Sequence, residues 1–340
     1  MAILGASYFF FKLSTTIHDS YDPIKRGKKS AEAQRDLAKQ GSFTVLLVGT
    51  DVKDASNKYW RSDTMILAAI NPKKKSMKMI SIPRDTYASI ANTPNGFKTK
   101  INAAPYYGIK AGVGPMTNTV YTLESYLNTP IKYYVKINFN GFIDITDTLG
   151  GTDVNVPFDF NLHVFNKQYY FKKGPAHLNG HEALAYVRMR KGDPRGDAGR
   201  NDRQREVIQS LMKKSMSFHS IGKMDDVLKA VGDNITHNMK LSEMLELQSI
   251  YRSIPKKNTE TLTLHGYNSN QKNAQKIYYY YVSEQERLRV SLTLRKQLDL
   301  PLQTFDGKPY EGDIPDKPSN MTPQQPNSST PATGNPTTSP

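Results

Sequence analysis

Three short apolar runs follow one another between residues 43 and 82, and they restrict the fold more than any other feature of the chain. Their sequences are FTVLLVG, TMILAAI and MKMISI, and each is bounded by polar or turn residues. Continuous rather than alternating hydrophobicity predicts strands that are buried on both faces. Helical patterns follow at Pro115 to Leu127, Gly141 to Leu149 and Arg203 to Met216. The sequence therefore predicts an α/β fold in which helices cover a sheet.

The segment YVRMRKGDPRGDAGRNDRQRE is the strongest candidate for a functional site, because it carries six arginines against four acids. Arg188 and Arg190 are two residues apart, so an extended strand end would place both on the same side. After the glycine-rich turn, Arg200, Arg203 and Gln204 fall on one helix face. Planar donors with a permanent charge suit forked hydrogen bonds to phosphate oxygens. The alternative is a solvated lattice of surface salt bridges.

Charged side chains also flank the three apolar runs. Asp51 follows the first run, Asp63 precedes the second, and Arg84 follows the third. In a sheet of largely parallel strands, ligands gather outside the strand ends, so these side chains are expected to share one site. Two carboxylates among arginines favour a hard divalent cation that bridges to phosphate oxygens. The alternative is that both aspartates are ordinary turn residues.

The charge balance of the chain indicates an anionic partner. There are 46 Lys and Arg against 31 Asp and Glu, a net charge of +15, which suits nucleic acid, an acidic membrane surface or a phosphorylated substrate. The absence of cysteine excludes thiolate metal sites, catalytic thiols and disulfides. A nucleic-acid-binding regulator is an alternative, but the basic stretch is interleaved with acids and glycines and no known nucleic-acid-binding motif appears. We therefore expect no nucleic acid partner.

Taken together, the motifs resemble the LytR-CpsA-Psr family of extracytoplasmic phosphotransferases, which act in bacterial cell-envelope assembly. The matching stretches occur in order between Phe43 and Met216: GTD, RSDTMIL, SIPRDTY, KINAAPYYG, GFIDITDTLGG, LNGHEALAYVRMR and DAGRNDRQ. The resemblance implies an α-β-α sandwich with a central mixed sheet and an apolar tunnel between sheet and helices. The tunnel would receive a polyprenyl chain, with the pyrophosphate of the lipid at its mouth.

The resemblance also implies roles for individual residues. Magnesium or manganese would be held by Asp51 and Asp63. The pyrophosphate would be bound by arginines and a supporting amide, to which we add the arginine that shares their helix face: Arg84, Arg188, Arg190, Arg200, Arg203 and Gln204. The positions tied to catalysis are Arg61, Asp63, Asp197 and Arg200, with Asp63 the candidate proton acceptor.

The activity implied is the transfer of an anionic glycopolymer, such as wall teichoic acid or capsular polysaccharide, from a polyprenyl-pyrophosphate carrier to peptidoglycan. A sugar hydroxyl would attack the phosphate next to the glycopolymer, and polyprenyl phosphate would leave. The alternative enzyme is a polyprenyl-pyrophosphate hydrolase that uses water as the nucleophile.

The chain is divided into four parts by composition: 1–13, 14–40, 41–305 and 306–340. The first begins with MAILGASYFFF, which covers roughly half of a ~30 Å hydrocarbon core, so it is either a buried helix start or the remnant of a longer membrane anchor. The resemblance favours the anchor, at the extracytoplasmic face of the cytoplasmic membrane. A charged linker, the catalytic domain and a disordered tail rich in Pro, Ser, Thr and Asn would follow.

Overall fold

A computed structural model describes residues 20–27, 31–32, 34, 41–190, 192–217, 232–269 and 277–316. The predicted anchor, most of the predicted linker and residues 317–340 of the predicted tail lie outside this part of the chain. Residues 306–316 are described, and the backbone N–H of Tyr310 donates to the carbonyl of Leu302 (3.0 Å). The ordered chain therefore continues past residue 305.

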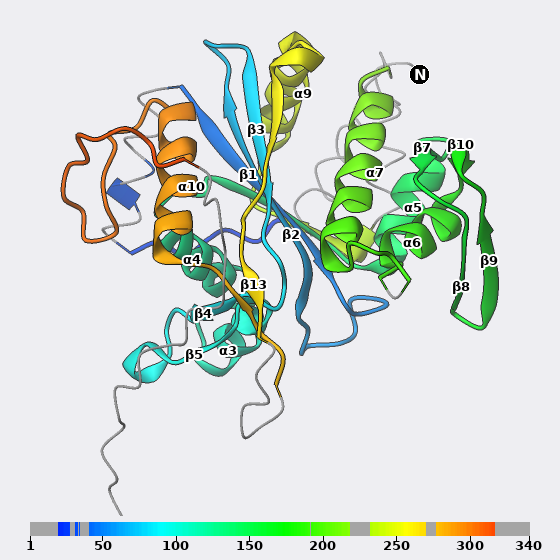
Figure 1. Ribbon diagram of the computed structural model, residues 1–340, viewed down its shortest axis with the longest axis horizontal. Helices are drawn as coiled ribbons and strands as arrows, with labels where there is room; N and C mark the ends of the chain where they lie inside the picture. Colours follow the sequence, from blue (N-terminus) through cyan, green and yellow to red (C-terminus); the bar gives the residue numbers. More distant parts are fainter. Residues whose placement is uncertain are drawn as a thin grey trace, which may run out of the picture.

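A mixed sheet forms the centre of the molecule (Figure 1). Strands β1 and β2 are antiparallel, as are β2 and β3 and also β11 and β6, whereas β6 lies parallel to β1 and β12 lies parallel to β3. The six strands, in their order across the sheet, are β11 (Ile235–His237), β6 (Tyr133–Ile137), β1 (Phe43–Thr50), β2 (Ser62–Asn71), β3 (Ser76–Ser81) and β12 (Thr259–Leu262).

Both faces of the sheet are covered, which explains the continuous apolar runs. On β1, Leu46 and Val48 are buried in one hydrophobic cluster, whereas Leu47 packs at the edge of another. Figure 1 shows α4 and α10 on one side of the sheet and α5, α6 and α7 on the other. The helices are α3 (Ala104–Lys110), α4 (Pro115–Leu127), α5 (Phe139–Thr148), α6 (Gly180–Arg188), α7 (Asp197–Ser217), α9 (Leu241–Ser253) and α10 (Glu284–Gln297). The predicted α-β-α sandwich is confirmed.

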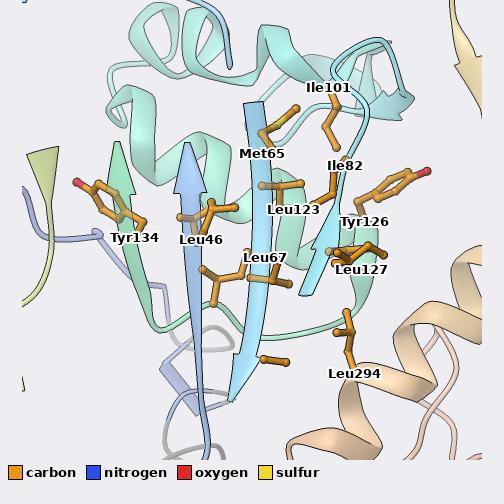
Figure 2. Packing of buried hydrophobic residues seen from close by; sticks show 14 of the residues in the cluster. Leu46, Met65, Leu67, Ile82, Ile101, Leu123, Tyr126, Leu127, Tyr134 and Leu294 are labelled. Carbon is orange, nitrogen blue, oxygen red and sulfur yellow. The ribbon is translucent and has the colours of Figure 1, made fainter. Parts of the chain in front are cut away.

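The layer between the sheet and α4 is a conventional apolar core. Leu46 and Leu67 from the strands and Leu123 from α4 are each at most 1% exposed, and Leu294 of α10 closes the layer (Figure 2). Helix α4 has the bounds that the sequence predicts. Pro115 is at its first position, where no backbone donor is needed, and Asn128 ends it in a left-handed conformation.

In the described part of the chain, four small two-stranded units and four short 3-10 turns accompany the sandwich. The pairs are β4 (Tyr87–Ser89) with β5 (Lys98–Lys100), β7 (Thr152–Val156) with β10 (Gly174–Leu178), β8 (Phe160–Val164) with β9 (Lys167–Phe171), and β13 (Tyr267–Asn268) with β14 (Tyr280–Tyr281). The turns are Pro94–Gly96, Ile101–Ala103, Gly232–Asn234 and Lys256–Asn258. Within the described ranges, no helix has the length and apolar character needed to cross a membrane.

Candidate active site

A cavity of about 680 Å³ lies between the sheet and helices α5, α6, α7 and α9. Its apolar wall includes Leu47, Val135, Ile145, Leu184, Ile208 and Leu211. Helix α7 follows the cavity from Arg200 to Ser215, which at about 1.5 Å per residue is a path of roughly 22 Å. An apolar space of this length suits a hydrocarbon chain, as the predicted tunnel requires.

Charged groups line the same cavity at the edge of the sheet where β1 ends and β2 begins. Thr50, Asp63 and Arg84 belong to this part of the wall. The sequence analysis placed these groups together by assuming a largely parallel sheet, and that assumption is wrong. They meet because β2 is antiparallel to both β1 and β3, so the end of β1, the start of β2 and the end of β3 share one edge.

Arg84 and Asp63 form an ion pair at this edge, with Nη1 2.7 Å from Oδ1. Asp85, the next residue, is bound by Lys100, whose Nζ lies 2.6 Å from Oδ1. The carboxylates of Asp63 and Asp85 therefore each have a cationic partner at this edge. An anion that enters can compete with Asp63 for Arg84.

The loop between β1 and β2 carries the other two predicted groups. The backbone N–H of Arg61 donates to Oδ1 of Asp51 (2.9 Å), which closes the base of the loop. Both residues are exposed and neither lines the cavity, although Asp51 directly follows Thr50, which does. The structure therefore places Asp51 beside the site, whereas Arg61 contributes its backbone to the loop and extends into solvent.

Arg188 and Arg190 both line the cavity, but not as a strand end. Arg188 is the last residue of helix α6, which begins with a capping box of Asn179 and Glu182, and Arg190 lies two residues beyond it. The expectation that an extended strand end carries both arginines is wrong, because Arg188 is the last residue of a helix. Met189, the residue after the helix, has φ −58° and ψ 126°, so the chain leaves the helical conformation between the two arginines.

The electrostatics of Arg188 indicate that the predicted groups are close to one another. Burial lowers its pKa and nearby Arg84 lowers it further, whereas the carboxylates of Asp63 and Asp51 raise it; the net pKa is below the usual arginine value. Arg190 lies with its guanidinium carbon 5.8 Å from the ring centre of Tyr278. The charged end of the cavity is therefore one electrostatic unit.

Helix α7 contributes Arg200 and Gln204 to the cavity wall, and Arg200 is only 6% exposed. Arg203, which was predicted to join them, does not line the cavity. Its guanidinium is 2% exposed, donates to Oδ2 of Asp193 (2.5 Å) and also donates to the carbonyls of Tyr186 and Met189. Since these acceptors hold it inside the molecule, we remove Arg203 from the candidate site.

Asp197 is the first residue of α7, and its side chain lies outside the described part of the structure.

The residues at this edge would hold a divalent cation only together with a bound ligand that supplies further oxygen atoms. The described residues contain no cluster of three or more His, Cys, Asp or Glu that would hold a metal ion by itself. Two aspartates are present, and the buried hydroxyl of Thr50 has no hydrogen-bond partner among the described residues. Magnesium is commonly bound by one or two carboxylates together with substrate phosphates and water. The donor set therefore fits a cation that arrives with a phosphorylated substrate.

Comparison with known proteins places this geometry in a family. The LytR_cpsA_psr family model matches residues 7–296. The chain belongs to the LytR_cpsA_psr family. Within it, the chain is 38% identical over 312 residues to the polyisoprenyl-teichoic acid–peptidoglycan teichoic acid transferase TagV of Bacillus subtilis, covering 90% of this chain and 78% of TagV.

Two solved LytR_cpsA_psr structures have the same architecture. The crystal structure of Bacillus subtilis TagV superimposes with a TM-score of 0.66 at 40% identity, covering 76% of this chain and 98% of that one. A structure of TagT bound to LI-WTA gives a TM-score of 0.61 at 30% identity, covering 78% and 93% of the two chains.

The sequence analysis did not identify the residues that hold the arginines of the LytR_cpsA_psr site in position. Asp193 and Arg203 hold the loop after α6 against α7, and Gly199 leaves room for the Asp193 carboxylate. Phe139 and Phe165 both lie against the guanidinium of Arg188. The local sequence does not show which of its charged residues pair with one another, and Phe139 and Phe165 are defined by Arg188, which is distant along the chain.

Proposed function

We propose that this protein transfers an anionic glycopolymer from a polyprenyl-pyrophosphate carrier to peptidoglycan, forming a phosphodiester link. The observation that carries the proposal is the single cavity that joins an apolar channel to a set of arginines. An amphiphile with a long hydrocarbon chain and a diphosphate head matches both parts. The names of the relatives, polyisoprenyl-teichoic acid–peptidoglycan teichoic acid transferases, support teichoic acid as the polymer.

Each charged residue has a role in this proposal. Arg84, Arg188, Arg190 and Arg200 neutralise the two phosphates, and Gln204 donates to a phosphate oxygen. Such preorganised donors stabilise the charge that develops as the bond to the leaving phosphate breaks. Asp63 accepts the proton of the attacking sugar hydroxyl, and Asp197 and Arg61 are further positions tied to catalysis. Polyprenyl phosphate is the leaving group and remains in the channel.

Magnesium or manganese completes the site in this proposal, held by Asp51 and Asp63 and by the substrate phosphates. The cation supplies charge neutralisation for the phosphates. Because Asp63 is also bound to Arg84 in the structure, cation binding would release Arg84 toward the substrate. Asp63→Asn is expected to raise the magnesium concentration needed for half-maximal transfer, and an unchanged magnesium dependence would remove Asp63 from the metal site.

The partners follow from the substrate. A polyprenyl-linked polymer and peptidoglycan meet at the extracytoplasmic face of the bacterial cytoplasmic membrane, so we propose that the protein acts there, anchored by its amino-terminal segment. No nucleic acid partner is part of this proposal.

Arginine substitutions test the proposal with a matched control in the same segment. Arg84→Ala and Arg190→Ala are each expected to lower transfer to a soluble peptidoglycan acceptor by about 10²- to 10³-fold, because each removes a charged donor from the phosphate. Arg195→Ala is the control, since Arg195 is 51% exposed and pairs with Asp202 outside the cavity. Transfer near the wild-type rate in both cavity variants would contradict the site.

Product analysis tests the reaction itself. With acceptor present, the expected product is glycopolymer joined to peptidoglycan. Release of free phosphorylated polymer at the same rate with and without acceptor would instead identify a hydrolase.

A further inference from the structure

The hairpin β8–β9 turns through two residues in the left-handed backbone region. Phe165 has φ 53° and Asn166 has φ 56°. A two-residue turn with positive φ at both positions favours Asn and Gly, because a bulky side chain is strained there. Asn166 suits the turn and Phe165 does not. A bulky residue that persists at a strained position suggests a functional constraint.

The ring of Phe165 lies against the charged end of the cavity. The guanidinium carbon of Arg188 is 5.2 Å from the ring centre of Phe165 and 4.5 Å from that of Phe139. The two rings meet edge to face, with centres 6.0 Å apart. They form an aromatic corner, by which we mean Phe139 and Phe165 together. Arg188 is thus in contact with two rings that come from different elements, α5 and the β8–β9 turn.

Arg188 is held differently from its neighbours. Arg84 donates to Asp63 and Arg203 to Asp193, whereas among the described residues no group accepts a hydrogen bond from the Arg188 guanidinium. A cation over aromatic faces is attracted by the ring quadrupoles without using its N–H donors. The aromatic corner therefore leaves these donors available for an anionic ligand.

The base of the hairpin is fixed to the helix that carries Arg188. Phe160 and Phe171 stack with ring centres 4.7 Å apart, and Phe171 lies 5.6 Å from Tyr186 of α6. The hydroxyl of Tyr186 donates to Glu206 of α7 (2.9 Å). The hairpin, α6 and α7 are therefore packed as one unit, which sets the position of the tip relative to Arg188.

We propose that Phe165 is a positioning residue, which acts with Phe139 to hold the Arg188 guanidinium toward the phosphates of the bound lipid. This inference rests on the proposed function and identifies which residues orient one of its arginines. The strained turn brings an aromatic ring to a guanidinium that, within the described ranges, donates no hydrogen bond to another residue.

Binding of geranylgeranyl pyrophosphate, compared with binding of geranylgeraniol, tests the proposal without requiring transfer. Phe165→Asn is expected to weaken pyrophosphate binding by roughly 2- to 30-fold, the range of a cation–π contact, and to leave the binding of the alcohol unchanged. Phe165→Tyr retains a ring and is expected to bind as the wild type does. Tyr170→Ala is the control, since Tyr170 is 76% exposed on the same hairpin.

The thermal midpoint separates positioning from folding. Asn is favoured at positive φ, so Phe165→Asn is expected to melt at or above the wild-type temperature. If Phe165→Asn melts below the wild-type temperature, pyrophosphate binding is compared between Phe165→Leu and Phe165→Tyr instead. The Leu variant keeps an apolar side chain but loses the ring quadrupole. Weak pyrophosphate binding by the Leu variant and normal binding by the Tyr variant would support the proposal. Equal binding by the two would overturn it.

A double-mutant cycle gives the decisive result. In an Arg188→Ala background, Phe165→Asn is expected to have no further effect on pyrophosphate binding. Phe165 affects binding through the Arg188 guanidinium, which this background lacks. The same loss in both backgrounds would overturn the proposal. A wild-type protein that binds the pyrophosphate and shows the expected cycle but transfers nothing would overturn the proposed function and leave the role of Phe165 intact.

Discussion

The carboxylate of Asp193 accepts a hydrogen bond from Nη1 of Arg203 at 2.5 Å, and both side chains are at least 98% shielded from solvent. The same guanidinium donates to the carbonyl of Tyr186, in the last turn of α6, and to that of Met189, the residue after the helix. One side chain of α7 therefore fixes the chain immediately before Arg188 and Arg190. The position of two cavity arginines depends on a third that does not line the cavity.

Removal of the Arg203 side chain is expected to be strongly destabilising. Arg203→Ala leaves the Asp193 carboxylate buried without its partner, so we expect a loss of about 3–5 kcal/mol in the free energy of unfolding. Denaturant unfolding measures this, with Lys308→Ala as the control, since Lys308 is 80% exposed and pairs with Asp306; it should lose less than about 1 kcal/mol. Similar losses in the two variants would show that the buried pair contributes little.

Gly199 is expected to resist the substitution that usually stabilises a helix. A Cβ at this position would lie 1.8 Å from Oδ2 of Asp193. Gly199→Ala should therefore cost about 1–3 kcal/mol, although alanine is normally better in a helix by about 1 kcal/mol. In an Asp193→Ala background the overlap is absent, and the same substitution should become neutral or stabilising. A destabilising effect in both backgrounds would point to another cause.

The stability of the protein in acid is expected to depend on Asp193. Burial raises the pKa of its carboxyl group, but the bonds from Arg203 and from the N–H of Arg195 lower it more, so the folded-state pKa lies below the usual value. The resulting stabilisation is complete above the unfolded pKa of about 3.9 and is lost as the pH falls through the folded value. Unfolding measured between about pH 2 and 6 should show a shallower acid dependence for Asp193→Asn. Parallel curves for the two proteins would refute this assignment.

Narrowing the channel is expected to select against long hydrocarbon chains. Ile208 lies on α7 in the apolar wall, two turns beyond Arg200. Ile208→Trp should weaken the binding of long polyprenyl pyrophosphates by more than tenfold, about 1.4 kcal/mol, while geranyl pyrophosphate binds nearly as before. Lys213→Trp, on the exposed side of the same helix, is the matched control. A uniform loss for all chain lengths would indicate damage to the fold rather than a blocked channel.

Helix ends that depend on residues close to them in the sequence could be predicted. Proline at the start of α4, an asparagine at its end and the capping box of α6 were readable because each depends on neighbours within a few residues. The run ALAYV suits a helix or a strand, and its packing through Tyr186 onto Phe171 settles the choice in favour of the helix.

The sequence predicted which residues belong to the candidate site, but it did not predict how they are arranged. Arg200 and Arg203 share a residue type and a helix face, and only the buried Asp193 separates a cavity arginine from a structural one. Phe165 carries no local signal at all, since its role depends on Arg188, which follows it by 23 positions in the chain (188 − 165 = 23).

The cavity wall includes residues of β1, which is near the start of the described chain, and residues of α9, which is near residue 250. A fragment must therefore extend from β1 to α9 to include every element that lines the cavity. Helix α9 contributes Leu245, Gln248 and Arg252 to the wall, so a chain that ends before α9 lacks this part of the enclosure. We expect such a shortened chain to bind a long hydrocarbon ligand less tightly than the full chain does.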